Sequence, residues 1–203
     1  MTYGTLKKRV MQLIFSYSVA GSEIPDTYNN QADYLAMIPS LVNDVQMDVA
    51  TTVRRLPAIA ELSSLEHYTL CGKELYTLPD DCWNLMTGGL LYRDSPLYDR
   101  FFGYRLIAGG RILEMPAHMG DEFAVEYWRY PTVVDDDTDE DQELDNTPDV
   151  HECIVYYVAS YLLLYDDSYR AKIFKDQYTE RLARLKEPVW AEPQAIHNLY
   201  DWR

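Results

Sequence analysis

The chain has 203 residues, of which 47% are hydrophobic and 25% charged, the balance of a folded protein rather than a disordered or collagen-like one. No run approaches the roughly 18–20 apolar residues that cross a bilayer, so we expect no membrane partner. The net charge of −15 repels phosphate, which argues against sequence-reading DNA binding.

Two stretches near the beginning show helical periodicity. Apolar residues recur at spacings of three and four from Thr5 to Ala20, and again from Gln31 to Leu56. The residues between them, Gly21 to Asn30, have the composition of a loop. Pro39 is expected to kink the second helix.

The middle third has the short aromatic and β-branched runs that are typical of strands. We expect Gly88-Gly89 and Gly109-Gly110 to form hairpin turns, because glycine supplies the positive φ angles that tight turns require. The predicted strands are 67–70, 75–78, 83–92, 104–107, 111–114 and 122–130. Together they predict an antiparallel sheet inserted between helical ends.

An acidic run follows this sheet. Residues Asp135 to Asp145 include eight carboxylates within eleven positions, and their mutual repulsion predicts a solvated segment. Thr147 and Pro148 then form a typical helix start, with Thr as the cap and Pro at the first helical position. Helical periodicity continues to Tyr165 and resumes from Ile173 to Leu185.

The last segment, residues 187–203, is too apolar for a free tail and too irregular for a domain. Two exposed tryptophans would be adhesive, so we expect this arm to dock against another polypeptide. The residues that we expect to dock are Val189, Trp190, Ile196, Leu199, Tyr200 and Trp202.

No catalytic or metal-binding pattern stands out. The four histidines lie far apart in the sequence, and the three cysteines, Cys71, Cys82 and Cys153, have no paired spacing, which predicts free thiols in a reducing compartment. The glycine pairs lack the context of a phosphate-binding loop, and the Asp pairs lack that of a calcium-binding loop. We therefore expect no catalytic residue, no metal and no cofactor.

The high aromatic content, with 18 Tyr and 4 Trp, favours assembly, because such rings are enriched at interfaces as well as in cores. A charge contrast suggests where copies would meet, since the acidic run precedes a helix rich in Lys and Arg. The alternative is two ordinary solvated surfaces. The predicted inter-subunit residues are Asp135, Asp136, Asp137, Asp139 and Glu140 on one side, and Arg170, Lys175, Arg181 and Arg184 on the other.

The order of these parts resembles the head-to-tail adaptor (connector, head completion) proteins of tailed phages. The resemblance rests on Leu78-Pro79-Asp80-Asp81 before a strand, Glu126-Tyr127-Trp128-Arg129-Tyr130-Pro131 at a strand exit, and Pro148-Asp149-Val150-His151-Glu152 at a helix start. It implies a non-enzymatic ring, commonly of twelve subunits, that docks beneath the portal and offers a platform to the tail or to a stopper. It also implies an extended C-terminal arm that reaches the portal or an adjacent copy, and residues 187–203 suit this role.

We therefore expect an α+β fold in which a helical bundle from both chain ends (residues 1–62 and 147–186) carries an antiparallel β insertion (63–133). An acidic linker (134–146) and a docking arm (187–203) complete the chain. The expected function is a virion adaptor at the head-tail interface, present in the host cytoplasm during assembly, that lines the DNA ejection channel without binding DNA specifically. The alternatives are a tail-completion or tube-terminator protein and a small cytosolic hydrolase.

Overall fold

The computed structural model describes residues 1–15, 30–62, 67–70, 73–94, 97–100, 102–116 and 123–186. Helices at both ends of the chain and antiparallel strands between them confirm the α+β class. The chain divides into two compact units, one from residues 1–45 with 134–203 and one from residues 46–133. We describe each unit by itself.

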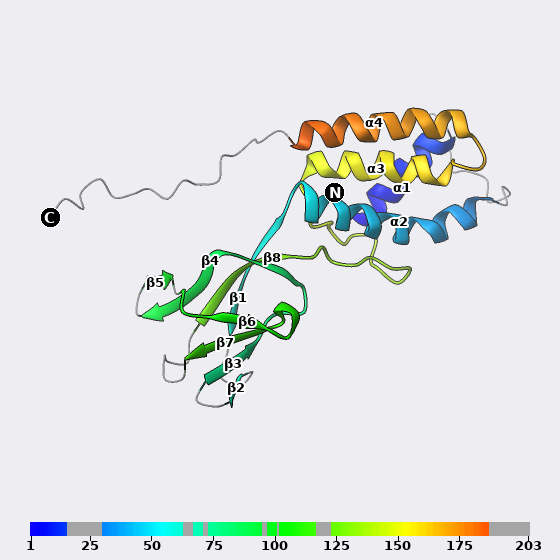
Figure 1. Cartoon of the computed structure of the whole chain (residues 1–203). Coiled ribbons are helices and arrows are strands. Elements are labelled where there is room, and N and C mark those ends of the chain that lie inside the picture. Colours follow the sequence, from blue (N-terminus) through cyan, green and yellow to red (C-terminus); the bar gives the residue numbers. More distant parts are fainter. Residues whose placement is uncertain are drawn as a thin grey trace. The chain divides into compact units, whose positions relative to one another are not determined.

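The helical unit is built around α3. In Figure 1, α3 lies between α2 and α4, and α1 lies behind it. The helices are α1 (Tyr3–Phe15), α2 (Asn30–Thr52), α3 (Pro148–Leu162) and α4 (Ser168–Lys186), and the last residues of α2, from Gln46 on, belong to the second unit. Pro39 lies inside α2, which continues through it.

The apolar stripes of these helices form the core of the unit. α3 is buried around most of its circumference, and the facing stripes of α1 and α2 are fully covered. Burial of such stripes away from water provides most of the stability of helices of this length. The residues with no exposed surface include Leu6, Val10, Ile38, Val42, Val150, Ile154 and Val158.

Polar contacts connect the end of α1 and the start of α2 to the region where α3 passes into α4. The Tyr34 hydroxyl donates a short hydrogen bond to Asp166, in the turn between α3 and α4. Its ring also lies 6.0 Å from that of Phe15, measured between centroids. The guanidinium of Arg170 donates to the carbonyl of Leu13, at 2.6 Å. The ends of α1 and α2 are therefore fixed to the α3–α4 turn.

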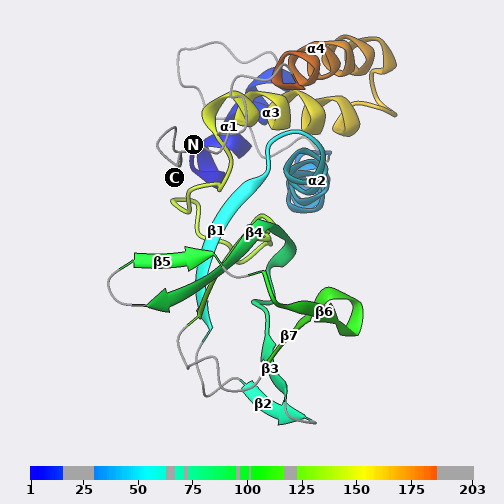
Figure 2. The ribbon, with the colours of Figure 1, turned by 60° about the vertical axis from the view of Figure 1, so that its left-hand side comes forward.

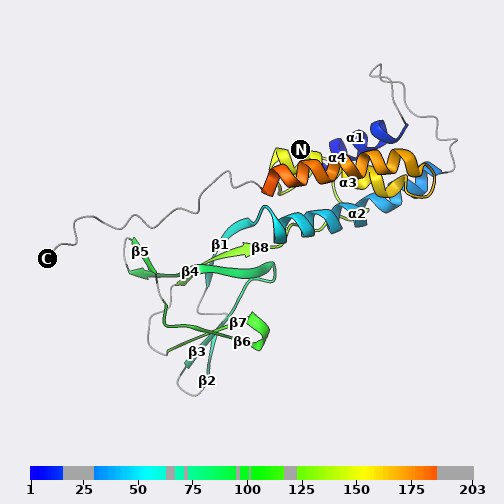
Figure 3. The same ribbon diagram turned by 45° about the horizontal axis from the view of Figure 1, so that its top comes forward.

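The second unit contains two four-stranded antiparallel sheets, with strand orders β1-β8-β4-β5 and β2-β3-β7-β6. Figures 2 and 3 show the two groups of strands apart from each other. The strands are β1 (Leu56–Leu62), β2 (His67–Leu70), β3 (Lys73–Thr77), β4 (Cys82–Asp94), β5 (Leu97–Arg100), β6 (Arg105–Ile107), β7 (Ile112–Pro116) and β8 (Phe123–Arg129).

A single apolar cluster holds the two sheets together. Tyr76 of β3 and Phe123 of β8 meet edge to face across it, with ring centroids 5.6 Å apart. Both rings are almost completely buried, and this geometry adds to the burial energy of an aromatic pair. The other members are Leu62, Leu78, Leu113, Met115, Val125 and Tyr127.

Two strands and one turn differ from the sequence-based prediction. It did not include β5, and it placed Leu56–Leu62 in the helical part, whereas these residues form β1 and pair with β8 from Leu56↔Arg129 to Leu62↔Phe123. Gly88-Gly89 is not a hairpin turn, because β4 runs through it with a register shift between Leu85 and Leu90. The hairpin at Gly109-Gly110 is confirmed, with positive φ at both glycines.

We predict that Phe123→Ala lowers the free energy of unfolding by about 3–5 kcal/mol, the range for deleting a buried phenyl ring. Phe102→Ala is the matched control, because that ring is 70% exposed, and its effect should stay within about 0.5 kcal/mol. Urea unfolding followed by circular dichroism measures both. Equal effects of the two substitutions would contradict this account of the core.

Candidate assembly surfaces

The acidic segment, residues 135–145, is ordered along its backbone while its charges remain in water. Its carbonyls at Glu140 and Gln142 accept hydrogen bonds from the backbone of Gly4 and Tyr3, at 2.8 and 2.9 Å. Leu144 donates in turn to the carbonyl of Met1 and is buried. The acidic side chains are largely exposed, as expected for a run of like charge.

These contacts cap α1. The first N–H groups of a helix have no acceptor within the helix. Here two of these groups donate to carbonyls from a distant part of the chain. Thr2 supplies a third acceptor through its hydroxyl, 3.3 Å from the backbone nitrogen of Thr5. The positive end of the helix dipole also faces this acidic segment, which stabilises negative charge there.

Close packing at Gly4 depends on the missing side chain. A Cβ at this position would lie 2.8 Å from the Cβ of Glu140 and 3.0 Å from its carbonyl oxygen. The Glu140 carboxylate reaches back to Lys7, at 2.9 Å, and this ion pair lowers the pKa of Glu140. The Lys7 ammonium also lies 4.8 Å from the centroid of the Tyr3 ring. Burial, followed by the nearby Asp136, raises the pKa of Tyr3 to about 12.

The predicted acidic interface residues fall into two groups. Asp135 accepts hydrogen bonds from the Thr138 hydroxyl and the Asp137 amide, and Asp139 accepts one from the Asp141 amide, so their carboxylates stabilise local turns. Glu140 is paired with Lys7. By contrast, the carboxylates of Asp136 and Asp137 are exposed and make no hydrogen bond or ion pair with another described residue.

The basic residues of α4 lie on two flanks. Arg170, Arg181 and Arg184 are eleven and three positions apart and so share one side of the helix, the arginine flank. Lys172, Lys175 and Lys186 have the same relation and share another side, the lysine flank. The predicted interface set took three residues from the first flank and one, Lys175, from the second.

Two residues of the arginine flank hold their own subunit together. Arg170 binds the Leu13 carbonyl, and the guanidinium of Arg181 lies 4.7 Å from the centroid of the Tyr156 ring. Arg184 is 71% exposed and pairs with Glu180 one turn earlier, a contact worth only about 0.3–0.5 kcal/mol. The three lysines make no ion pair with another described residue.

The motifs that carry the family resemblance make structural contacts. Asp81 accepts a hydrogen bond from the Tyr127 hydroxyl at 3.0 Å, and its carbonyl accepts one from the Tyr130 amide at 2.8 Å, so two of the motifs meet. In the third motif, Glu152 pairs with Arg9 of α1. Thr147 is the N-cap residue of α3, as predicted, but its hydroxyl makes no capping hydrogen bond, and its carbonyl accepts the first helical bonds from Val150 and His151.

The two cysteines in the described part of the chain, Cys82 and Cys153, lack the lowered pKa of an activated thiol. Burial raises the pKa of Cys153 to about 11 and also raises that of Cys82, the opposite of what a nucleophilic thiol needs. Within the described ranges, no three His, Cys, Asp or Glu side chains come together as a metal site. No described helix is long and apolar enough to span a membrane.

Six of the predicted docking residues lie outside the described part of the chain, and two residues at the assembly surfaces, Gly4 and Lys172, were not among the predicted site residues. The arm residues Val189, Trp190, Ile196, Leu199, Tyr200 and Trp202 all fall beyond residue 186. No local pattern marks Gly4, since its constraint comes from a segment some 136 positions away. Lys172 belongs to the basic helix that was predicted, but it is not in the predicted interface set, because a count of charges does not separate the flanks of a helix.

The described surfaces of the helical unit thus combine exposed charges with ordered backbone contacts. A family model described as SU10 adaptor protein matches residues 1–197, and the chain therefore belongs to this family of phage adaptor proteins. It is a structural family, and membership makes the chain a structural adaptor of a bacteriophage and a component of its virion. No curated protein matches the chain.

We predict that Gly4→Ala destabilises the protein by about 1–3 kcal/mol, because the added methyl group collides with the backbone of the acidic segment. In an open helix the same change would stabilise by about 1 kcal/mol. Lys8→Ala, at an exposed position of α1, is the control and should be close to neutral. Urea unfolding measures the sign, and stabilisation by Gly4→Ala would contradict the close contact.

We predict that stability falls as the pH drops below 6.5 because of His151. Burial, followed by the Met1 ammonium 3.4 Å from Nδ1, lowers the pKa of this imidazole from 6.5, while Asp149 and Glu152 oppose the shift. Below pH 6.5 the unfolded chain therefore binds more protons than the folded one, and each bound proton favours unfolding.

His151→Gln removes this titration and should flatten the slope of the unfolding free energy against pH between 6.5 and the onset of carboxylate titration. Chemical denaturation at a series of pH values measures that slope. An unchanged slope in the variant would contradict the assignment to His151.

Proposed function

We propose that the chain acts as a ring-forming adaptor that joins the portal at the capsid vertex to the tail or to a stopper. Membership of the adaptor family is the observation that carries this proposal. The excess of negative charge supports a ring that surrounds DNA, because an acidic wall lets the duplex slide without gaining affinity from phosphate contacts. A ring of twelve copies is what the family resemblance implies.

We also propose that the acidic segment of one copy faces the arginine flank of the next. Five members of the predicted set already bind within their own subunit, namely Asp135, Asp139, Glu140, Arg170 and Arg181, and Lys175 lies on the other flank of α4. The side chains that we expect to make this contact are therefore Asp136 and Asp137 on one copy and Arg184, whose pair with Glu180 is exposed, on the other. Complementary charge of this kind fixes register and partner choice more than it adds affinity.

Cryo-electron microscopy of virions tests the function directly. Density for this chain should form a ring between the portal and the tail, with DNA on its axis. A position elsewhere in the tail, such as the end of the tail tube, would contradict the proposed adaptor role.

We predict that Arg184→Glu weakens self-association, most strongly at low salt where screening is least. Arg105→Glu is the matched control, because it makes the same charge change at an exposed position of β6. Adding Asp136→Lys and Asp137→Lys to Arg184→Glu should restore association. Sedimentation at several salt concentrations measures the mass, and equal behaviour of Arg184→Glu and its control would refute the charge pairing.

A further inference from the structure

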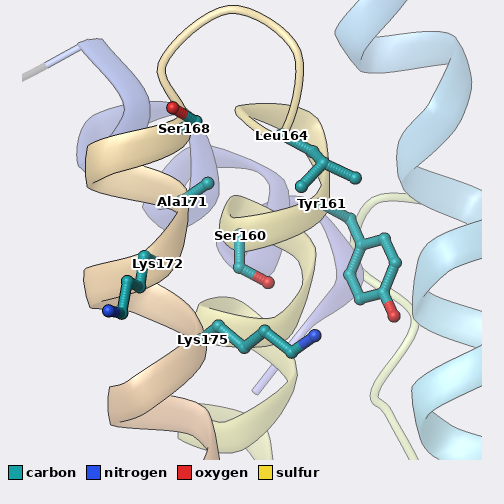
Figure 4. Close-up of a pocket in the computed structure, with 7 residues that line it drawn as sticks. All are labelled: Ser160, Tyr161, Leu164, Ser168, Ala171, Lys172 and Lys175. Carbon is teal, nitrogen blue, oxygen red and sulfur yellow. The ribbon is translucent and has the colours of Figure 1, made fainter.

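A groove between α3 and α4 lies within the helical unit and takes no part in the contacts described above. It is lined by Ser160, Tyr161 and Leu164 on the α3 side and by Ala171, Lys172 and Lys175 on α4, and its volume is about 270 Å³. Figure 4 shows Lys175 extending from α4 toward α3, below Ser160 and Tyr161, whereas Lys172 turns away from α3. The lining of the groove is mainly apolar, and the two lysine ammonium groups lie at its edge.

One residue that lines the groove, Leu164, is exposed, and two exposed tyrosines follow it in the chain, in the α3–α4 turn and at the start of α4. Tyr165 is 92% exposed, Tyr169 is 75% exposed, and Leu164 and Ile173 are about half exposed. Exposed Tyr side chains suit protein contacts, because Tyr supplies a large apolar area together with a polar tip.

The size and charge of the groove indicate its occupant. Its volume lies below the roughly 300–1,000 Å³ of most small-molecule sites, so it suits a few protruding side chains rather than a metabolite. The lysine flank above it has no ion pair with another described residue. The fitting partner is thus a peptide that carries large apolar side chains and nearby carboxylates.

We propose that residues 187–203 of a second copy bind in this groove. In this segment the apolar residues that we expect to dock are interspersed with Glu187, Glu192 and Asp201, against a single basic residue, Arg203. The apolar side chains match the lining of the groove and the exposed tyrosines, and the carboxylates match the lysine flank. This identifies a partner surface for the arm, and it rests on the proposed ring.

The geometry of the chain suits an exchange between copies. α4 ends at Lys186, roughly 21 Å along the helix from Lys172 at 1.5 Å per residue, and residues 187–203 follow it in the chain. Seventeen extended residues span at most about 60 Å, which is enough to reach a neighbour. The two binding surfaces lie on different parts of one chain, and such head-to-tail contacts generate rings when the rotation closes.

Photo-crosslinking in the full chain tests the proposal. The substitution Leu164→p-benzoylphenylalanine places the probe in the groove, in a mixture of unlabelled and ¹⁵N-labelled copies at concentrations up to the millimolar range. Mass spectrometry then identifies the crosslinked peptides and shows whether both halves come from one copy. We expect crosslinks to residues 187–203 that join differently labelled copies.

Lys172→Glu with Lys175→Glu should reduce the yield of these crosslinks at least tenfold at low salt. Lys8→Glu with Arg105→Glu is the matched control, with the same change in net charge away from the groove, and it should leave the yield unchanged. Equal losses in both pairs would mean that general repulsion, not the groove, controls the contact, and would overturn the proposal.

Sedimentation of the same samples separates this proposal from the proposed function. Oligomers that form without groove crosslinks to residues 187–203, or with crosslinks to the acidic segment instead, would overturn the groove assignment and leave the ring intact. Crosslinks within single copies only would overturn the exchange between copies. A chain that neither associates nor crosslinks at any concentration tested would contradict both proposals.

Discussion

The helical unit depends on how the N-terminus of α1 satisfies its backbone. The first N–H groups of any helix need acceptors from outside it, and at Tyr3 and Gly4 these are carbonyls of the acidic segment. Chain regions about 140 positions apart are thereby joined at the start of α1. The same contact brings Leu144 into the core and places the Met1 ammonium beside His151 at the start of α3. The acidic segment, whose charges alone favour a solvated chain, is thus held against the helical unit by its backbone.

The two flanks of α4 differ in their contacts, because this helix lies at the edge of the bundle. Arginines on one flank meet a backbone carbonyl and an aromatic ring of their own subunit, where a planar guanidinium is well suited to both partners. Lysines on the other flank border an apolar groove and remain exposed. One helix can therefore stabilise its own subunit through one side and present a cationic edge to other chains through the other.

The β unit shows how short motifs can be structural without being catalytic. The turn around Pro79 places Asp81 where it receives the Tyr127 hydroxyl and the Tyr130 amide, which fixes the entry of β4 against the exit of β8. Burial and this hydrogen bond raise the pKa of Tyr127 to about 12. The phenol therefore stays protonated at physiological pH and keeps its role as a donor. The residues that resemble the family motifs therefore help to fix the pairing of β4 with β8.

The sequence alone determined the helices, most strands and the hairpin at Gly109-Gly110, because hydrophobic period and glycine at positive φ are local properties. It also indicated an assembly role through charge and aromatic content. Only the tertiary structure decided that Leu56–Leu62 is a strand, since Pro57 and two alanines favour no strand by themselves and the pairing with β8 supplies the reason. The same holds for the partners of each charge: Glu140 pairs with Lys7, Arg170 turns inward and Arg184 stays exposed. Pairing of charges depends on distances across the fold, and a sequence records only distances along the chain.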